Sequence, residues 1–285
     1  AFMQDVICHP FYLALQEIIH EAADAIMEIY QGSDFAIEQK ADDSPVTAAD
    51  MAAHNIIVAG LNKLTPDIPV LSEENVIPYE ERKKWPMLWV VDPLDGTKEF
   101  IKRNGEFSIN IALVENHKSI LGMVYLPVTQ EGYFGVTGDW QDMEKVAVKW
   151  TQDETQILEV RVPKSPLIAM TSRSHGPNLP DSLKDILFEN YEHIEEIAKG
   201  SSIKACRIAE GEADLHLRRG PTCEWDTAAS QAVVEAAGGV LMSFNGEPFR
   251  YNARESLLNG HFLVTGSELM PIILNWYLQQ QLTED

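Results

Sequence analysis

The sequence predicts a mixed α/β protein (an α+β fold), with an antiparallel sheet in its first half and a mixed α/β arrangement in its second half. Between residues 107 and 148, short apolar runs follow one another with brief polar connections, as in an antiparallel sheet. From residue 167 onward, apolar runs alternate with segments of helical periodicity. The polar residues 150–160 separate the two patterns, so we expect two halves, 1–160 and 161–285.

Composition narrows the class of protein. The chain has 285 residues, of which 45% are hydrophobic, so it can bury the core of one large domain or two modest ones. A formal net charge of −22 argues against binding a nucleic-acid polymer and disfavours a membrane surface, although peripheral membrane contact stays open. Three cysteines without paired spacing suggest reduced thiols and a cytoplasmic setting. We expect no signal peptide and no transmembrane span, because the first residues lack a basic region and no apolar run reaches 18 residues.

Two amphipathic helices are expected near the start of the chain. Apolar residues recur at helical spacing over 11–30, and Gly32 would end that helix. A second helix is expected over about 47–64, with Thr47 as its N-cap and Asp50 in its first turn. An acid at such a position commonly interacts with the helix dipole, so the pattern alone leaves the role of Asp50 open.

Two expected strands end at carboxylates. One short strand runs into Glu73, and the apolar run 87–91 stops at Asp92. Asp95 follows three residues later, so the turn aims two carboxylates, together with the Leu94 carbonyl, at one point. Oxygen ligands of this kind suit a hard cation such as Mg²⁺. Asp-Pro and Asp-Gly pairs are also common in ordinary turns, so a plain loop remains an alternative.

The same turn also suits a phosphate group. Gly96 permits a backbone conformation that other residues resist, and Thr97 is expected to cap a short helix over 98–100. Unpaired N–H groups at a turn and a helix start bind anions. This stretch is therefore a candidate for holding both a metal ion and the phosphate on which it acts.

The second half offers further polar groups where its elements begin or end. The segment 200–202 opens a helix that reaches about residue 211, and helix starts of this composition bind anions. The polar and basic residues concerned are Ser172, His175, Gly200, Ser201, Ser202, Lys204 and Arg218. The other expected elements are a strand over 66–71, a surface excursion over 75–86, helices over 180–189 and 226–237, strands over 193–197, 213–217 and 262–264, and a terminal helix over 267–282.

Four acids sit at the ends of expected elements, namely Glu73, Asp92, Asp95 and Asp226. Acids that are far apart in the sequence can converge on two or more Mg²⁺ ions, and paired metal ions stabilise the attacking and leaving oxygens of a phosphoryl group. Each acid taken alone can equally be a helix cap or a turn residue. Spacing alone does not establish that the four converge.

Several motifs resemble the inositol monophosphatase superfamily of Mg²⁺-dependent, lithium-sensitive phosphatases. They are the segments 71–74, 92–97, 225–229 and 235–239. Within that superfamily, the segments 44–50, 95–107, 172–175 and 200–204 are most similar to the bacterial 3′(2′),5′-bisphosphate nucleotidases of sulfur assimilation. The resemblance implies an αβαβα layered sandwich that hydrolyses adenosine 3′,5′-bisphosphate to AMP and phosphate. It also implies a cytoplasmic enzyme, which in some members lies at the inner face of the membrane.

The resemblance assigns a role to each candidate residue. It implies that two or three Mg²⁺ ions are bound by Glu73, Asp92, the Leu94 carbonyl and Asp95, which belong to the first half, and by Asp226, which belongs to the second half. It places water activation on Asp50 and Thr97, with Glu73 as a further catalytic residue. It places substrate binding, mostly in the second half, on Gly96, Thr97, Ser172, His175, Gly200, Ser201, Ser202, Lys204 and Arg218.

Arg218 bears on the choice of substrate. Aligned on Gly220, it lies where inositol monophosphatases usually carry a glutamate that accepts hydrogen bonds from sugar hydroxyls. Arginine only donates hydrogen bonds and prefers phosphate, so it favours a substrate with a second phosphate. Without the resemblance, the sequence would favour a plain surface charge at Arg218.

Two other classes of function stay open from the sequence. One is an inositol monophosphatase or a fructose bisphosphatase of the same superfamily, and the other is a protein that senses a nucleotide or a metal without catalysis. The complete set of acids together with Thr97 argues against a sensor, because a protein that only binds has no need of water activation. The sequence does not define the oligomeric state.

Overall fold

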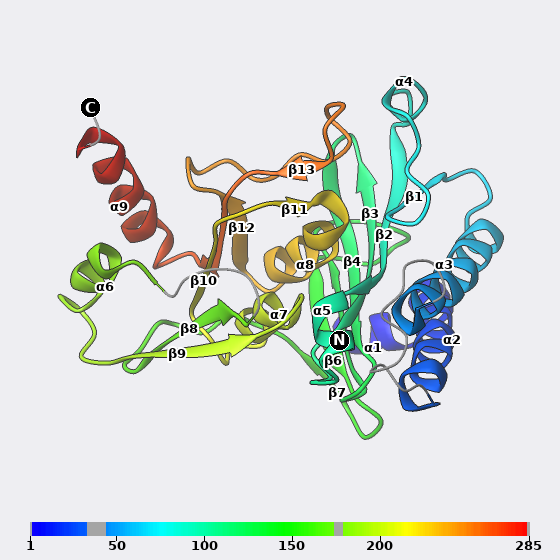
Figure 1. The fold of residues 1–285 in the computed structure, drawn as a ribbon, viewed down its shortest axis with the longest axis horizontal. Helices are drawn as coiled ribbons and strands as arrows, with labels where there is room; N and C mark the ends of the chain where they lie inside the picture. Colours follow the sequence, from blue (N-terminus) through cyan, green and yellow to red (C-terminus); the bar gives the residue numbers. More distant parts are fainter. Residues whose placement is uncertain (1, 33–43, 174–178, 284–285) are drawn as a thin grey trace.

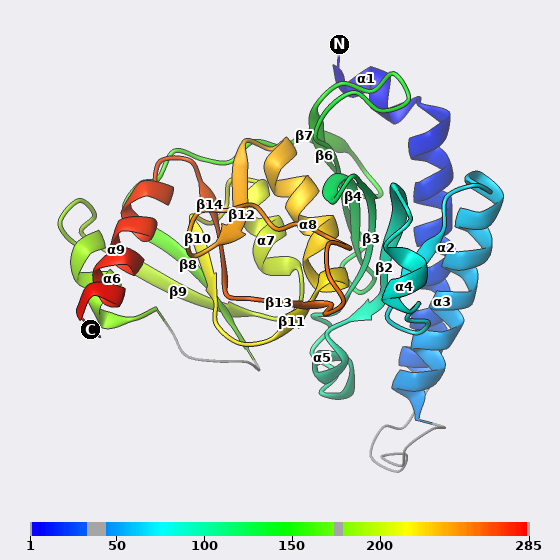
Figure 2. The ribbon, with the colours of Figure 1, turned by 90° about the horizontal axis from the view of Figure 1, so that it is seen from above.

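The computed structural model describes residues 2–32, 44–173 and 179–283, and these residues form five layers (Figures 1 and 2). Helices α2 (Pro10–Gly32) and α3 (Pro45–Leu64) cover one face of a seven-stranded sheet. Helices α7 (Ile203–Ala209) and α8 (Glu224–Ala236) lie between this sheet and a five-stranded sheet. The outer layer consists of α6 (Asp181–Leu187) and α9 (Met270–Thr283). The expected αβαβα sandwich is confirmed.

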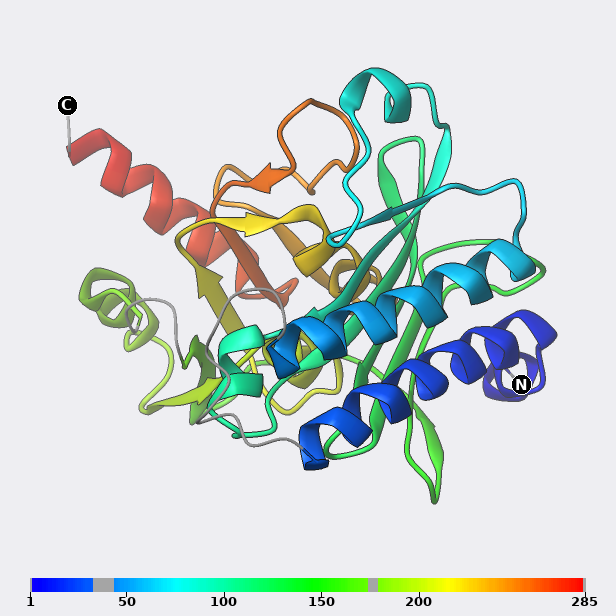
Figure 3. The same ribbon diagram turned by 45° about the vertical axis from the view of Figure 1, so that its right-hand side comes forward.

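The first helical layer begins differently from the prediction. A short helix α1 (Phe2–Ile7) precedes α2, and α2 and α3 pack side by side (Figure 3). The N-cap of α3 is Ser44, whose Oγ accepts a hydrogen bond from the Thr47 N–H at 3.2 Å. The prediction that Thr47 is the cap was wrong, because Pro45 fits the first helical position and leaves the cap to the residue before it. Asp50 consequently lies in the second turn of the helix.

The first sheet is antiparallel as predicted, apart from its first pair of strands. Its strands follow in sequence order, and only β1 and β2 pair in parallel. The edge strand β7 falls within the polar segment 150–160, and helix α4 (Tyr79–Arg82) lies between β1 and β2. The strands are β1 (Val70–Ser72), β2 (Met87–Asp95), β3 (Ser108–Glu115), β4 (Lys118–Leu126), β5 (Glu131–Val136), β6 (Val146–Trp150) and β7 (Thr155–Ile157).

The second sheet mixes parallel and antiparallel pairs in the order β12-β14-β10-β8-β9. The prediction missed β12 and a two-stranded ribbon of β11 and β13, because each is short and follows glycine or polar residues. The strands are β8 (Leu167–Ser172), β9 (Ile194–Lys199), β10 (Leu215–Arg218), β11 (Thr222–Cys223), β12 (Gly239–Ser243), β13 (Leu258–Asn259) and β14 (Phe262–Gly266). None of the helices in the three described stretches is long and apolar enough to cross a bilayer.

Helix α8 sits unusually close to the first sheet. A Cβ atom on Gly135 would lie only 2.7 Å from the Cα of Val233, so glycine on the strand lets the helix backbone approach directly. Nearby, Ser119 Oγ donates a hydrogen bond of 2.6 Å to the Ala228 carbonyl of the helix. These contacts fix α8 on the sheet, and they thereby fix the position of Asp226 in its first turn.

Candidate active site

A cavity of about 520 Å³ lies where β2, α7, α8 and β10 meet. It brings together residues from both halves of the chain. The predicted site residues that line it are Glu73, Asp92, Leu94, Asp95, Gly96, Thr97, Ser172, Gly200, Ser201, Ser202, Lys204, Arg218 and Asp226. Asp50 is not among the lining residues in the described part of the chain, and His175 lies outside the described residues.

Three of the acids form one tight group. Carboxylate oxygens of Asp92, Asp95 and Asp226 all lie within 4.8 Å of one another, although the residues come from β2 and α8. Asp92 Oδ1 accepts a hydrogen bond of 3.2 Å from the Leu94 N–H, which orients the strand end. Asp226 Oδ2 accepts one of 2.7 Å from the Cys223 N–H, which caps α8. Asp226 therefore both caps α8 and lies close to Asp92 and Asp95, so the two roles expected from the sequence are combined in one residue.

Burial and mutual repulsion perturb these carboxyls. Removal from water, with Glu73, Asp95 and Asp226 nearby, raises the pKa of Asp92 well above its usual range. Burial and Asp226 raise the pKa of Asp95 to about 7. The pKa of Asp226 is likewise raised, chiefly by burial. A cluster of hard oxygen donors with this excess of negative charge fits a divalent cation of the Mg²⁺ type, which would favour the ionised forms.

Asp95 is held in place by polar side chains from two other elements. Its Oδ2 accepts hydrogen bonds from Ser202 Oγ at 3.1 Å and from Asn110 Nδ2 at 3.4 Å. Asn110 Nδ2 also donates to Ser202 Oγ at 3.0 Å, so β3, β2 and the start of α7 are linked. The sequence analysis missed Asn110, because a single polar residue in an apolar strand gives no sign of what it will face.

Another missed residue, Glu106, fixes the loop that precedes α7. Its carboxylate accepts a hydrogen bond of 2.8 Å from the Gly200 N–H and two of 2.8 Å from the Arg173 guanidinium. These interactions, with Lys199 close by, hold the pKa of Glu106 below its usual value despite partial burial, which opposes the shift. The segment 200–202 is thus anchored from the first half of the chain.

The turn after β2 differs in detail from the prediction. Gly96 has φ of +93° and is the N-cap of α5 (Thr97–Ile101), so the prediction that Thr97 is the cap was wrong by one residue. A Cβ at position 96 would also lie 3.0 Å from the Glu106 carbonyl oxygen. Glycine is required there by both conformation and space. Thr97 becomes the first helical residue, with its side chain at the cavity.

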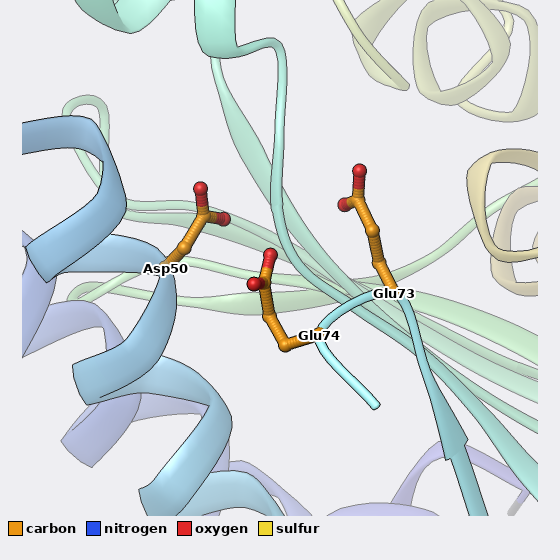
Figure 4. A group of neighbouring side chains, drawn as sticks. All are labelled: Asp50, Glu73 and Glu74. Carbon is orange, nitrogen blue, oxygen red and sulfur yellow. The ribbon is translucent and has the colours of Figure 1, made fainter. Parts of the chain in front are cut away.

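A second acidic group, drawn in Figure 4, contributes Glu73 to the same cavity. Carboxylate oxygens of Asp50, Glu73 and Glu74 lie within 4.8 Å of one another; Asp50 comes from α3 and the glutamates follow β1. Burial, aided by Glu74 and Glu73, raises the pKa of Asp50 to about 8. Its Oδ1 is buried without a hydrogen-bond partner in the described structure. Glu74 was not predicted, because nothing in the sequence distinguishes the second of two adjacent acids.

The proposed Asp50–Thr97 pair is not joined by a hydrogen bond within the described residues, so its role remains a prediction. Glu73, in contrast, interacts with both acidic groups. It raises the pKa of Asp50 and of Asp92, and its own pKa is raised by burial with the neighbouring acids contributing. Glu73 therefore lies where it can connect the two groups.

In the described part of the chain, five lysine and arginine residues line the cavity with the acids, namely Lys98, Arg173, Lys204, Arg218 and Arg219. Two of them, Lys204 and Arg218, interact with the acidic group. Lys204 is 7% exposed, and its Nζ donates hydrogen bonds to the carbonyls of Lys199 at 3.1 Å and Ser201 at 2.9 Å. Burial lowers the pKa of Lys204 to about 8, while Asp95 opposes that shift. Arg218 Nη1 donates to Ser172 Oγ at 3.1 Å, and its buried Nε has no partner in the described structure. A ligand with more than one anionic group suits this arrangement.

Residues 8–275 match the model of the inositol monophosphatase family. The chain is 47% identical over 251 residues to the 3′(2′),5′-bisphosphate nucleotidase CysQ of Salmonella typhimurium, which spans 87% of this chain and 97% of that protein. Among solved structures it resembles CysQ from Bacteroides thetaiotaomicron, with 42% identity, a TM-score of 0.77 and coverage of 89% and 96% of the two chains. It also resembles an inositol monophosphatase from Zymomonas mobilis, with 25% identity, a TM-score of 0.71 and coverage of 97% and 98%.

Proposed function

Because the chain belongs to the inositol monophosphatase family, we propose that it is a Mg²⁺-dependent phosphatase that hydrolyses adenosine 3′,5′-bisphosphate to AMP and phosphate. The observation that carries this proposal is one cavity that combines a group of acids with basic side chains, of which Lys204 and Arg218 interact with those acids. The acids suit metal ions and a reacting phosphate, and the basic side chains suit a second phosphate. The name of the Salmonella relative supports the same substrate. Lithium sensitivity, a cytoplasmic location and a role in sulfur assimilation belong to the proposal.

The acids would hold the metal. Asp92, Asp95, Asp226, Glu73 and the Leu94 carbonyl offer oxygen ligands of the hard type that Mg²⁺ prefers, and they suffice for two or three ions that share carboxylates. Bound Mg²⁺ would supply an acidified water and would offset the negative charge that develops on the phosphate oxygens.

The remaining residues would position the reactants and move one proton. Gly96 and Thr97 line the cavity, and their backbone N–H groups would donate to the oxygens of the phosphate that is cleaved. The Thr97 hydroxyl would accept a proton from the attacking water while it passes its own proton to the Asp50 carboxylate. The resulting hydroxide would add to phosphorus as the bond to the ribose 3′ oxygen breaks, and a proton from solvent would neutralise that oxygen as it leaves.

The other phosphate would bind at Arg218 and Lys204. The unpaired Nε of Arg218 is a buried donor, and such a donor is costly unless a ligand satisfies it. A guanidinium also matches two oxygens of one phosphate. An inositol monophosphate would leave this donor unpaired, because it carries no second phosphate.

A substrate panel tests the proposal. Phosphate release with Mg²⁺ should be fastest for adenosine 3′,5′-bisphosphate and slower for inositol 1-phosphate and fructose 1,6-bisphosphate. Arg218→Ala should lower kcat/KM for adenosine 3′,5′-bisphosphate by about tenfold to a hundredfold, the scale of a charged hydrogen bond. It should change the value for adenosine 3′-monophosphate much less.

Arg219→Ala is the matched control: Arg219 also lines the cavity, but its guanidinium stacks over the Trp276 ring, 5.5 Å from the ring centroid. Equal losses on both substrates with Arg218→Ala, or a larger loss with Arg219→Ala, would show that the second phosphate binds elsewhere. Fastest release from inositol 1-phosphate would contradict the substrate assignment itself.

A further inference from the structure

A histidine that the sequence did not single out lies in the wall of the cavity. His216, on β10, is 2% exposed and lines the same cavity as the acids. Its Nδ1 lies 2.9 Å from the carbonyl oxygen of Met170 on the neighbouring strand β8. A carbonyl only accepts hydrogen bonds, so Nδ1 carries a proton. The ring nitrogen that remains for a ligand is Nε2.

The surroundings keep this ring neutral. Burial, together with the nearby Lys204 and Arg218, which would repel an imidazolium, lowers the pKa of His216 to about 3. A neutral ring with its proton on Nδ1 presents Nε2 as a hydrogen-bond acceptor. Lys204 and Arg218 can only donate, so His216 differs from both in what it can bind.

Two other polar side chains that line the cavity already have partners. Thr227 Oγ1 lies 3.0 Å from the Tyr251 hydroxyl, and Ser230 Oγ donates to the Thr227 carbonyl at 3.2 Å. The Ser201 hydroxyl also lines the cavity and has no partner in the described structure, but it can donate as well as accept. His216 Nε2 differs from it as a neutral group that only accepts, so it pairs with a donor on the ligand.

The position of His216 indicates which part of a ligand it meets. His216 and Arg218 are two residues apart on β10, so their side chains project from the same face of the strand, and both line the cavity. The ring thus lies beside the proposed place of the second phosphate. In a nucleoside 3′,5′-bisphosphate, the group that joins this phosphate to the cleaved one is the ribose. The only hydrogen-bond donor on that ribose is its 2′ hydroxyl.

We propose that His216 Nε2 accepts a hydrogen bond from the ribose hydroxyl adjacent to the phosphate that is cleaved, so that His216 selects ribonucleotide over deoxyribonucleotide bisphosphates. This inference rests on the proposed function and deepens it. A deoxyribose analogue would leave a buried acceptor without a partner, and sites built to pair a hydroxyl discriminate against analogues that lack it.

The test compares kcat/KM for adenosine 3′,5′-bisphosphate with kcat/KM for its 2′-deoxy analogue. The wild-type ratio should be about ten or more. His216→Phe keeps a planar ring but has no acceptor, so the ratio should fall to about one. His216→Gln can still donate to Met170 and accept from the substrate, so it should retain part of the ratio. His20→Leu is the control, because His20 lies on α2, where it accepts a hydrogen bond from Trp150 at 3.0 Å, and it should keep the wild-type ratio.

The outcomes separate this inference from the function on which it rests. A role limited to holding β10 against β8 would lower kcat/KM for both substrates together and leave their ratio unchanged, so an unchanged ratio in His216→Phe overturns the inference. A wild-type ratio near one overturns it as well, while hydrolysis of both compounds would still support the proposed function. Failure of the wild-type protein to hydrolyse either compound overturns both.

Discussion

Asp95→Asn should stabilise the metal-free protein while it removes the stabilisation that Mg²⁺ provides. Asp95 forms no salt bridge within the described residues, and its hydrogen bonds come from Ser202, Asn110 and Ser108. Its charged neighbours include Asp226, which adds to the rise of its pKa caused by burial, and Lys204, which opposes that rise. The ionised side chain is therefore unfavourable in the folded protein until a cation binds. Asparagine keeps the shape and the acceptor oxygen but removes the charge.

The size and pH dependence of the effect follow from the pKa of Asp95. Its pKa is raised from the usual 3.8 to about 7, which corresponds to on the order of 4 kcal/mol of folding free energy at 1.36 kcal/mol per unit. A carboxyl whose pKa is raised in the folded state does not lower the folding stability below pH 4, where it is protonated in both the folded and the unfolded state. It lowers that stability progressively as the pH rises toward 7. The weaker hydrogen bonds of the amide offset part of the gain, so we expect about 1–3 kcal/mol above pH 7 and almost none near pH 4.

This prediction can be tested by thermal unfolding of wild type and Asp95→Asn at pH 4 and pH 8, in a chelator and in excess Mg²⁺. In chelator at pH 8, Asp95→Asn should unfold several degrees above wild type, since about 1 kcal/mol shifts Tm by roughly 2–4 °C in a chain of this size. Wild type should gain stability from Mg²⁺ and the variant should gain little.

The control is Asp214→Asn, because buried Asp214 accepts a hydrogen bond of 2.8 Å from Arg161. That variant should unfold below wild type with and without Mg²⁺. A lower Tm of Asp95→Asn in chelator at pH 8, or an undiminished response to Mg²⁺, would refute the metal assignment.

Three further predictions concern catalysis, inhibition and the fold. Thr97→Ala and Asp50→Asn should each lower kcat by about 10²-fold in steady-state assays and change KM less; unchanged kcat in both would exclude the pair. Li⁺ should inhibit phosphate release in the millimolar range or below at constant ionic strength, as in relatives with this metal chemistry, and insensitivity at far higher concentrations would separate the chain from them. Arg82→Met should lower the free energy of unfolding by about 3 kcal/mol in denaturant titrations, because buried Arg82 donates hydrogen bonds to several carbonyls. The exposed neighbouring residue Lys83 provides the control, and Lys83→Met should change the free energy of unfolding by about 0.5 kcal/mol or less.

Periodicity predicted most elements, because long apolar patterns report directly on which face is buried. The expected helix over 11–30 is α2, and the apolar run 87–91 is the start of β2. The end of β2 was predicted too early, because Asp-Pro normally signals a turn. In the structure Asp92 pairs with Asn110 and Asp95 with Ser108, with an irregular register between them, so the acids belong to the strand itself.

The candidate site was predictable only in part, for a physical reason. An acid at the end of a strand can be recognised because strand ends meet at one edge of a sheet, and Asp92, Asp95 and Asp226 are indeed close together. The groups that orient such acids leave no comparable pattern. Asn110 and Glu106 act across 92 and 94 residues of sequence, on Ser202 and Gly200, and only the folded chain shows these contacts.

The segment 75–86 contains a further polar contact that the sequence does not reveal. It was expected to be a surface excursion, yet Arg82 within it is buried and donates a hydrogen bond of 2.8 Å to Asn252 Oδ1. The Asn252 N–H donates in turn to Glu224 Oε1 at 2.7 Å, in the first turn of α8. Glu73 precedes this excursion and Asp226 lies two residues after Glu224, so one buried guanidinium connects the chain segments that carry two of the proposed metal ligands. The spacing of ligands from distant parts of the sequence thus depends on a polar contact outside the cavity. In the sequence, Arg82 cannot be distinguished from an arginine exposed to solvent.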